Sequence, residues 1–405
     1  MKNYSSKKHL TIIFCTILLD MIGIGILIPI IPYLFDTKSI YSIIPAYINP
    51  DNSYLWQGIV LAIFPMFQFI MAPILGEISD HYGRKKILIF CVIGTLIGYV
   101  MTAYSIFTHN FIWFVLGRII DGISGGNISI AMASIADVSD NKDKARNFGI
   151  IGAAFGIGFV IGPAIGGILA ANFNAAAPFI FAGLLSVINI LAISYFVKET
   201  REKSKDSNFK LHPSQAINNV ISGFKIKELR NIFTVQMLYT SGFAFYTAFA
   251  GVYMKERFGF GLDQIGYYFA FIGICIGLTQ GFIVSRVFNK KWSDAKILYT
   301  SLFIFSAVIL VYIFSYNLYL NLILVPVFTV CIGLANTAIG AITSKKAGAE
   351  TQGRTIGISS GIQALSGTAP QFLAGLSATY FVYYAPFFGT LVLVLLATYF
   401  AAKDK

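Results

Sequence analysis

Two acidic residues and one arginine stand inside stretches that are otherwise apolar. Asp20 lies within the run Leu10 to Leu34, and Arg118 and Asp121 lie within the run Phe111 to Ala136. A charge in such surroundings costs about 2.5–3.5 kcal/mol on insertion scales, so it faces a partner or a water-filled cavity. Burial favours the neutral form of a carboxyl group, and a nearby cation favours its ionised form. A carboxyl beside an arginine that moves can therefore take up and release a proton.

The depth of Asp20 makes it the best candidate for this chemistry. It stands ten residues into its stretch, which places it about 15 Å deep, near the middle of a bilayer. We predict that Asp20 carries the proton, that Arg118 is its modulating cation, and that Asp121 belongs to the same site. Two structural alternatives stay open: Asp20 is a polar anchor, or Arg118 and Asp121 form an i,i+3 ion pair that only fixes helix packing.

The composition indicates that the elements carrying these residues cross a membrane. Of 405 residues, 56% are hydrophobic and 12% are charged, against about 25% charged in soluble domains. Because a spanning helix needs about 20 apolar residues, the sequence predicts twelve spans, at residues 10–34, 56–78, 87–107, 111–136, 146–170, 178–197, 231–254, 263–287, 296–315, 319–344, 354–379 and 382–402. We predict an all-α polytopic membrane protein with a six-helix bundle at 1–197, a cytoplasmic linker at 198–230 and a second six-helix bundle at 231–405.

The basic residues predict the orientation. Of the 30 lysines and arginines, 26 fall in the two termini and in alternate loops, so we expect both termini in the cytoplasm and the chain in the inner membrane. This distribution argues against a nucleic-acid partner. The four cysteines lie in apolar segments without metal or disulfide spacing, and no G-x-x-x-x-G-K-[ST] motif is present. We therefore expect no metal, no cofactor and no use of ATP, and we assign no role to the outer loop 36–55.

The two halves repeat each other. Arg146-x-x-Gly149 opens a predicted helix that continues to Gly167, and Arg354-x-x-Gly357 opens one that continues to Gly375. The offset is 208 residues at all three positions. Parallel repeats with a site at their interface are typical of transporters, so we expect the two bundles to be pseudo-symmetric.

The turn after the second predicted helix reads GEISDHYGRKK, from Gly76 to Lys86. It resembles the loop signature of the major facilitator superfamily. This resemblance implies a conformational latch between the halves, built from Gly76, Asp80, Gly83, Arg84 and Lys85. Physically, we expect Gly76 to permit a close helix contact and Gly83 a tight turn. Asp137 and Glu199, at inner helix ends, are expected to be ion-pair partners.

Further motifs resemble those of proton-coupled drug exporters in this superfamily. One is Gly158-x-x-x-Gly162-Pro163-x-x-Gly166-Gly167, whose small residues let two helix backbones approach closely. The first helix, with Asp20 followed by a glycine-rich stretch to Pro32, is similar to the opening of the tetracycline and multidrug proton antiporters, as is Arg257-Phe258-Gly259-Phe260. The sequence departs from the tetracycline carriers where they have an acid on the third helix, here near Gly98 and Tyr99. It also lacks their histidine on the eighth helix and their aspartate on the ninth, which argues against a tetracycline–metal chelate as substrate.

The candidates for a substrate cavity are amide side chains on apolar helices, which need partners or water. They are Gln57, Gln68, Asn127, Gln236, Gln280, Asn336 and Gln363.

These observations predict a secondary active transporter that exports a small amphiphilic, drug-like compound in exchange for a proton, by alternating access. Its partners would be the small-molecule substrate, protons and the lipid bilayer, and we expect a monomer. The alternative is a proton-coupled exporter or uptake carrier of a metabolite such as a siderophore, sugar or organic acid. We expect no enzyme and no catalytic residue, because none of the four histidines lies within a predicted span.

Overall fold

The computed structural model describes residues 6–138, 144–201, 215–288, 292–347 and 352–403, and these ranges are almost wholly helical, without a strand. The predicted all-α class is therefore confirmed. The cysteines at 15, 91, 275 and 331 are free thiols.

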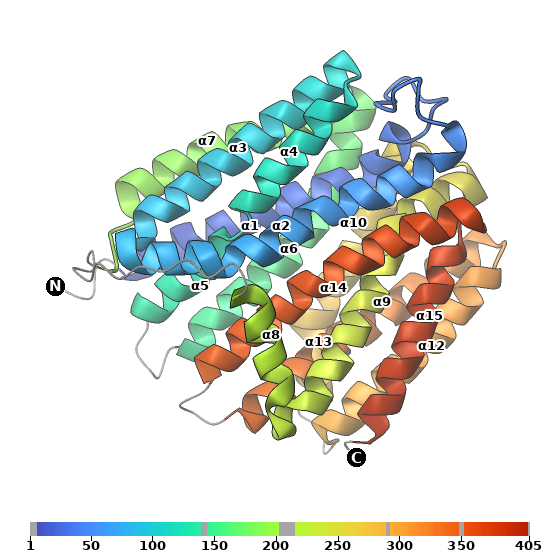
Figure 1. Cartoon of the computed structure of the whole chain (residues 1–405). Helices are drawn as coiled ribbons and strands as arrows, with labels where there is room; N and C mark the ends of the chain where they lie inside the picture. Colours follow the sequence, from blue (N-terminus) through green and yellow to red (C-terminus); the bar gives the residue numbers. More distant parts are fainter. Residues whose placement is uncertain (1–5, 139–143, 202–214, 289–291, 348–351, 404–405) are drawn as a thin grey trace. The chain divides into compact units, whose positions relative to one another are not determined.

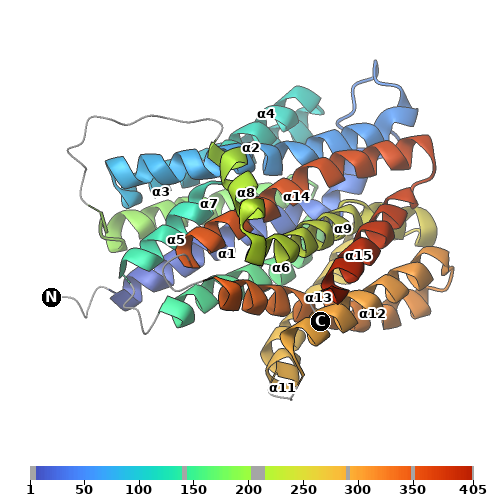
Figure 2. The same ribbon diagram turned by 60° about the horizontal axis from the view of Figure 1, so that its bottom comes forward.

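The helices follow one another in the order shown in Figure 1 and, turned by 60°, in Figure 2. The first seven are α1 (Ser6–Leu34), α2 (Ser53–Tyr82), α3 (Arg84–Thr108), α4 (Phe111–Ser124), α5 (Asn127–Val138), α6 (Lys144–Asn172) and α7 (Ala177–Phe196), with a short 3-10 turn at Pro50–Asn52 before α2. The others are α8 (Gln215–Lys225), α9 (Lys227–Phe258), α10 (Leu262–Leu278), α11 (Val284–Phe288), α12 (Asp294–Phe314), α13 (Leu318–Lys346), α14 (Gln352–Tyr380) and α15 (Ala385–Ala402).

Each of the twelve predicted spans falls on helical residues. Eight helical segments among the described residues are long and apolar enough to cross a membrane. Two predicted spans are interrupted. The span 111–136 is divided into α4 and α5 at Gly125 and Gly126, and the span 263–287 contains a five-residue π-helical turn at Thr279–Ile283. Breaks of this kind in spanning helices occur where the freed backbone groups find other partners.

The chain forms two compact units. The first comprises Met1–Ile48 and Ile63–Ala216, and the second comprises Asn49–Ala62 and Ile217–Lys405. The division at Ala216 falls inside the predicted linker, which contains α8. Helix α2 contributes to both units, and its residues change unit beside Pro65. A proline inside a helix lacks the N–H that would bond to the carbonyl four residues earlier. One backbone hydrogen bond of α2 is therefore missing close to the point where the helix passes from one unit to the other.

The glycines of the exporter-like motif pack α6 against α1. A Cβ atom on Gly162 would lie 2.9 Å from the Cα atom of Gly25, and one on Gly166 would lie 2.5 Å from the carbonyl oxygen of Ile26. The two backbones therefore touch without intervening side chains, as small residues in membrane helices allow. Pro163 faces the same seam, because its Cδ atom would lie 2.7 Å from a Cβ atom on Gly25.

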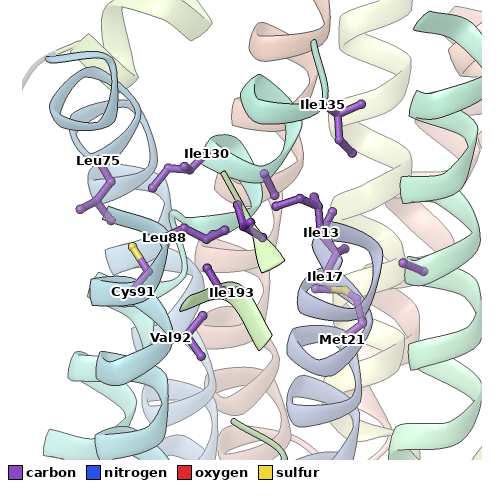
Figure 3. Packing of buried hydrophobic residues seen from close by; sticks show 13 residues of the cluster. Ile13, Ile17, Met21, Leu75, Leu88, Cys91, Val92, Ile130, Ile135 and Ile193 are labelled. Atoms are coloured by element: carbon purple, nitrogen blue, oxygen red, sulfur yellow. The ribbon is translucent and has the colours of Figure 1, made fainter. Parts of the chain in front are cut away.

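An apolar cluster packs the helices of the first unit together. Its buried members come from α1, α2, α3, α5, α6 and α7, and Figure 3 shows Ile13, Ile17, Leu88, Ile130 and Ile193 among them. Ile13, Ile17 and Ile130 have no exposed surface. This close packing holds α1 in a fixed position beside α5, which matters because α1 carries Asp20.

The Arg257-Phe258-Gly259-Phe260 motif ends α9 in the second unit. Gly259 has φ +67°, a conformation that suits glycine. The Arg257 guanidinium lies 3.8 Å from the ring centroid of Tyr316 and donates to the carbonyl of Ile313 at 2.7 Å. The motif therefore ties the end of α9 to the connection between α12 and α13.

Candidate functional site

Asp20 lies on α1 and faces the interior of the first unit. The side-chain amide of Asn127 donates from Nδ2 to Oδ2 of Asp20 at 2.5 Å. The carboxyl group also borders a small cavity lined by Asp20, Ile24, Phe64, Gln68, Thr95, Tyr99, Asp121, Gly125, Asn127 and Ile128. Among the described residues no cation forms an ion pair with Asp20. The predicted proton carrier thus sits in a polar pocket between helices of one unit.

Arg118 is paired with Asp121. Its Nη1 lies 3.0 Å from Oδ2 of Asp121, and both side chains are only 8% exposed. The guanidinium also stacks 4.7 Å from the ring centroid of Phe64, and its Nε finds no hydrogen-bond partner among the described residues. The i,i+3 ion pair considered from the sequence is therefore formed. Arg118 reaches the site of Asp20 through Asp121, which lines the same cavity.

Asp121 packs against α3 at a glycine. A Cβ atom on Gly98 would lie 2.9 Å from the Cβ atom of Asp121. The sequence departs from the tetracycline carriers by lacking an acid on the third helix near this position. In this protein the fourth helix places a carboxylate beside that point of the third. Spacing along the chain could not reveal this, because the relation depends on how α3 and α4 face each other.

Two hydroxyl groups on α3 belong to the site, and sequence reasoning did not single them out. Tyr99 and Thr95 both line the cavity. The hydroxyl end of Tyr99 lies over Gly23 of α1, where any larger side chain would collide with it. Because the two residues are four positions apart on a helix, they lie on one face. This i,i+4 pair of hydroxyl residues was the signal that could have found them.

The break between α4 and α5 lies at the cavity. Gly125 and Asn127 both line it, and the break frees the carbonyl of Gly125 from the helical ladder. Gln68 of α2 satisfies this carbonyl by donating from Nε2 at 3.0 Å. Two of the predicted cavity amides, Gln68 and Asn127, are therefore brought together with Asp20.

The other five predicted amides lie in the second unit. Gln57 is buried and donates to the carbonyl of Ala248 at 3.2 Å. Gln236 exchanges hydrogen bonds with the hydroxyl of Ser359, at 2.8 and 3.0 Å. The last three are exposed: Gln280 in the π-helical turn, Asn336 on α13 and Gln363 on α14. The predicted set is therefore divided between the two units, and only its first-unit members adjoin the carboxylates.

The predicted latch residues form an ion-pair network within the first unit. Arg84 lies 2.7 Å from Oδ1 of Asp80 and 2.6 Å from Oδ2 of Asp137. Glu199 accepts from the backbone N–H of Arg84 at 2.7 Å and so binds the start of α3, where the helix dipole favours negative charge. Asp137 thus forms the ion pair that we expected with a basic residue of the inner turn, whereas the contacts of Glu199 with that turn are hydrogen bonds from the backbone N–H groups of Arg84 and Lys85. Lys85 donates from Nζ to the carbonyl of Ser194 at 2.7 Å.

The two motif glycines differ in what surrounds them. Gly83 has φ +102°, and a Cβ atom there would lie 2.8 Å from the carboxyl carbon of Glu199. It therefore forms the turn that we expected. A Cβ atom on Gly76 would meet no heavy atom of the described residues within 4 Å. In this part of the chain the close helix contact expected at Gly76 is therefore not found.

The expectation that no histidine lies within a span is wrong for His9 and His81, which fall inside the candidate spanning segments Lys8–Leu34 and Pro50–Tyr82. Because α1 begins at Ser6, one turn before the apolar run, His9 lies inside the helix, with 2% of its surface exposed. Its Nε2 lies 2.8 Å from the hydroxyl of Ser134 on α5. The described residues contain no group of three or more His, Cys, Asp or Glu side chains that could hold a metal ion.

The chain is similar to membrane transporters over nearly its whole length. The family model of the Major Facilitator Superfamily matches residues 13–370. The tetracycline resistance protein of class C from Escherichia coli is 30% identical over 299 residues, which cover 72% of this chain and 70% of that protein. The class D protein from Salmonella ordonez is 28% identical over 374 residues, which cover 91% and 89% of the two chains.

Solved structures share the fold. The crystal structure of the human organic anion transporter MFSD10 has a TM-score of 0.75 at 22% identity and covers 98% of this chain and 99% of its own. A bacterial homolog of the human lysosomal transporter Spinster has a TM-score of 0.75 at 16% identity and covers 100% and 97%. These similarities confirm the predicted fold class. The family match and the curated relatives show that the chain is related to transporters and not to enzymes. The chain belongs to the Major Facilitator Superfamily and is a multi-pass membrane transporter of small molecules.

Proposed function

We propose that this protein exports a small amphiphilic compound across the inner membrane in exchange for a proton, by alternating access between two bundles. The observation that carries the proposal is Asp20, a carboxyl group held by an amide, without a cation partner among the described residues, in the cavity that Asp121 also lines. Asp20, Asp121 and Arg118 together carry a formal charge of −1, because two carboxylates meet one guanidinium. One added proton neutralises this site.

The relatives support export. Several curated relatives are tetracycline resistance proteins, at 27–30% identity. A resistance protein that is a transporter lowers the amount of drug in the cell. The charge distribution of the sequence supports cytoplasmic termini, and we propose that one chain is the functional unit. The ion-pair network of Arg84, Asp80 and Asp137 supports a conformational latch at the inner turn.

The proposal is tested by transport in everted membrane vesicles energised with a pH gradient. Asp20→Asn keeps the size of the side chain but removes its titration. We expect it to abolish accumulation driven by the gradient while the purified protein remains monodisperse. Asp51→Asn, at an exposed position before α2, is the matched control and should transport normally. Undiminished gradient-driven transport by Asp20→Asn would rule Asp20 out as the carrier.

A second candidate is a proton-coupled carrier of a metabolite such as a siderophore, sugar or organic acid. The observation in its favour is the absence of any acidic residue between Ala295 and Phe314 of α12, the helix in which the tetracycline carriers have an aspartate. The two candidates differ in the direction of proton movement when the second is a symporter. A substrate added to vesicles then changes the internal pH with opposite sign in antiport and symport.

A further inference from the structure

We infer that Asn127 is a positioning residue that turns its side-chain amide over when Asp20 gains or loses its proton. The inference rests on the proposed function, because it takes Asp20 to be the group that titrates. Asn127, at the start of α5, would be the residue whose hydrogen bonding changes with the protonation state of Asp20.

The hydrogen bonding of Asn127 is incomplete in a way that points to a second arrangement. Nδ2 donates to Asp20 at 2.5 Å, whereas Oδ1 is buried without a hydrogen-bond partner among the described residues. Only 2% of the residue is exposed. Leaving a buried acceptor unsatisfied is unfavourable, so this arrangement is stable only while the donation to the carboxylate is strong.

The two protonation states of Asp20 need opposite partners. An ionised carboxylate only accepts hydrogen bonds, and a protonated carboxyl group has an O–H that must donate. A primary amide supplies both, a donor at Nδ2 and an acceptor at Oδ1. Half a turn of the terminal amide exchanges these two atoms at nearly the same position. Asn127 then accepts from neutral Asp20 where it previously donated to ionised Asp20.

Asn127 is the side chain already in contact with Asp20 that can supply this acceptor. Asp121 is ion-paired with Arg118, and Tyr99 of α3 lines the same cavity as Asp20. Among the described residues, only Asn127 forms a side-chain hydrogen bond with Asp20. We therefore expect the protonated carboxyl group to use Asn127 as its acceptor.

Asn127 is well placed to pass this change on. It is the first residue of α5 and follows Gly125 and Gly126, where the spanning helix is broken. The carbonyl of Gly126 accepts the first bonds of α5, from the N–H groups of Ser129 and Ile130 at 3.1 and 3.4 Å. Because glycine restrains the backbone least, a rotation at Asn127 can be followed by a change in the direction of α5.

Infrared difference spectroscopy on the full chain in proteoliposomes, between acid and alkaline pH, tests the inference. The carboxyl C=O band of protonated Asp20 is assigned as the band that Asp20→Asn removes. We expect Asn127→Leu to move this band to higher frequency, because the hydrogen bond is lost, and to lower coupled efflux about tenfold. Asn127→Thr, whose hydroxyl both donates and accepts, should retain a hydrogen-bonded band and most of the coupled efflux.

The matched control is Asn189→Leu. Asn189 is another buried asparagine that bonds to α1, accepting from the hydroxyl of Thr16 at 3.0 Å, and its loss should leave the Asp20 band in place. An Asp20 band that Asn127→Leu does not move would overturn the inference while the proposed function stands. A wild-type spectrum without any Asp20-dependent band would overturn both. If Asn127→Leu does not fold, the wild-type protein provides the test. Protonation of Asp20 should then shift an infrared band that isotope labelling assigns to an asparagine side chain. A spectrum without such a shift would contradict the inference.

Discussion

Arg118 donates to Asp121 at 3.0 Å, and in the described part of the chain it forms no such pair with Asp20. The two carboxylates of the cavity are therefore not equivalent. Asp121 is neutralised by a cation three positions earlier on the same helix, and Asp20 is held by an uncharged amide. This difference supports our proposal that Asp20 is the carboxyl that exchanges a proton, whereas Asp121 holds Arg118 in place.

The pairing predicts strong coupling between Arg118 and Asp121. Removing one partner of a buried ion pair leaves an uncompensated charge and costs about 3–5 kcal/mol. We expect Arg118→Met and Asp121→Asn each to lower the free energy of unfolding by this amount, and the double variant to lower it by less than the sum. Unfolding by SDS in mixed micelles measures the free energy of unfolding of each variant. Asp20→Asn, which strands no cation, should cost clearly less than either single change. Additive single effects would contradict the ion pair.

The seam between α1 and α6 predicts a steric effect at Gly162. A Cβ atom there would lie 2.6 Å from the carbonyl oxygen of Ile22, so Gly162→Ala must push two backbones apart. We expect a loss of about 1–3 kcal/mol, as for other overpacked sites, together with reduced transport. Gly340→Ala on α13 is the control, because a Cβ atom there meets no atom of the described residues within 4 Å, and it should leave thermal stability equal or higher. Equal behaviour of the two variants would show that the seam is not close-packed.

The turn before α3 predicts opposite outcomes for the two glycines of one motif. Gly83→Ala forces a residue with a Cβ atom into φ +102° and against the carboxylate of Glu199. We expect it to cost about 1–3 kcal/mol and to weaken the contact between Glu199 and the start of α3. Gly76→Ala should be tolerated in thermal unfolding, because the space beside it is open. A drop in melting temperature for Gly76→Ala as large as that for Gly83→Ala would contradict this difference.

Much of the architecture could be predicted from local pattern. Apolar runs of about 20 residues predicted where the long helices lie, because a membrane helix must satisfy its own backbone and cover itself with apolar side chains. The break at Gly125–Gly126 and the π-helical turn at Thr279–Ile283 were missed, because glycine-rich apolar stretches have the same hydropathy whether or not their backbone is continuous.

The site was predicted in part for a similar reason. Asp20, Arg118 and Asp121 stood out because charges in apolar stretches are costly wherever they lie. The partners of these charges come from elsewhere in the chain: Asn127 is 107 residues from Asp20, and Tyr99 reaches across to Gly23. Which of the seven candidate amides lie near the carboxylates depends on how each helix is rotated about its axis.

The sequence by itself determined that the chain is a helical membrane transporter with an ionisable group deep in its first helix, since hydropathy, charge and motif spacing are properties of neighbouring residues. Only the tertiary structure decided that Arg118 pairs with Asp121, that Asn127 binds Asp20 and that α2 contributes to both compact units. These relations arise from side-chain packing between helices that are distant in sequence. The order of residues along one helix does not determine how a neighbouring helix is rotated about its own axis.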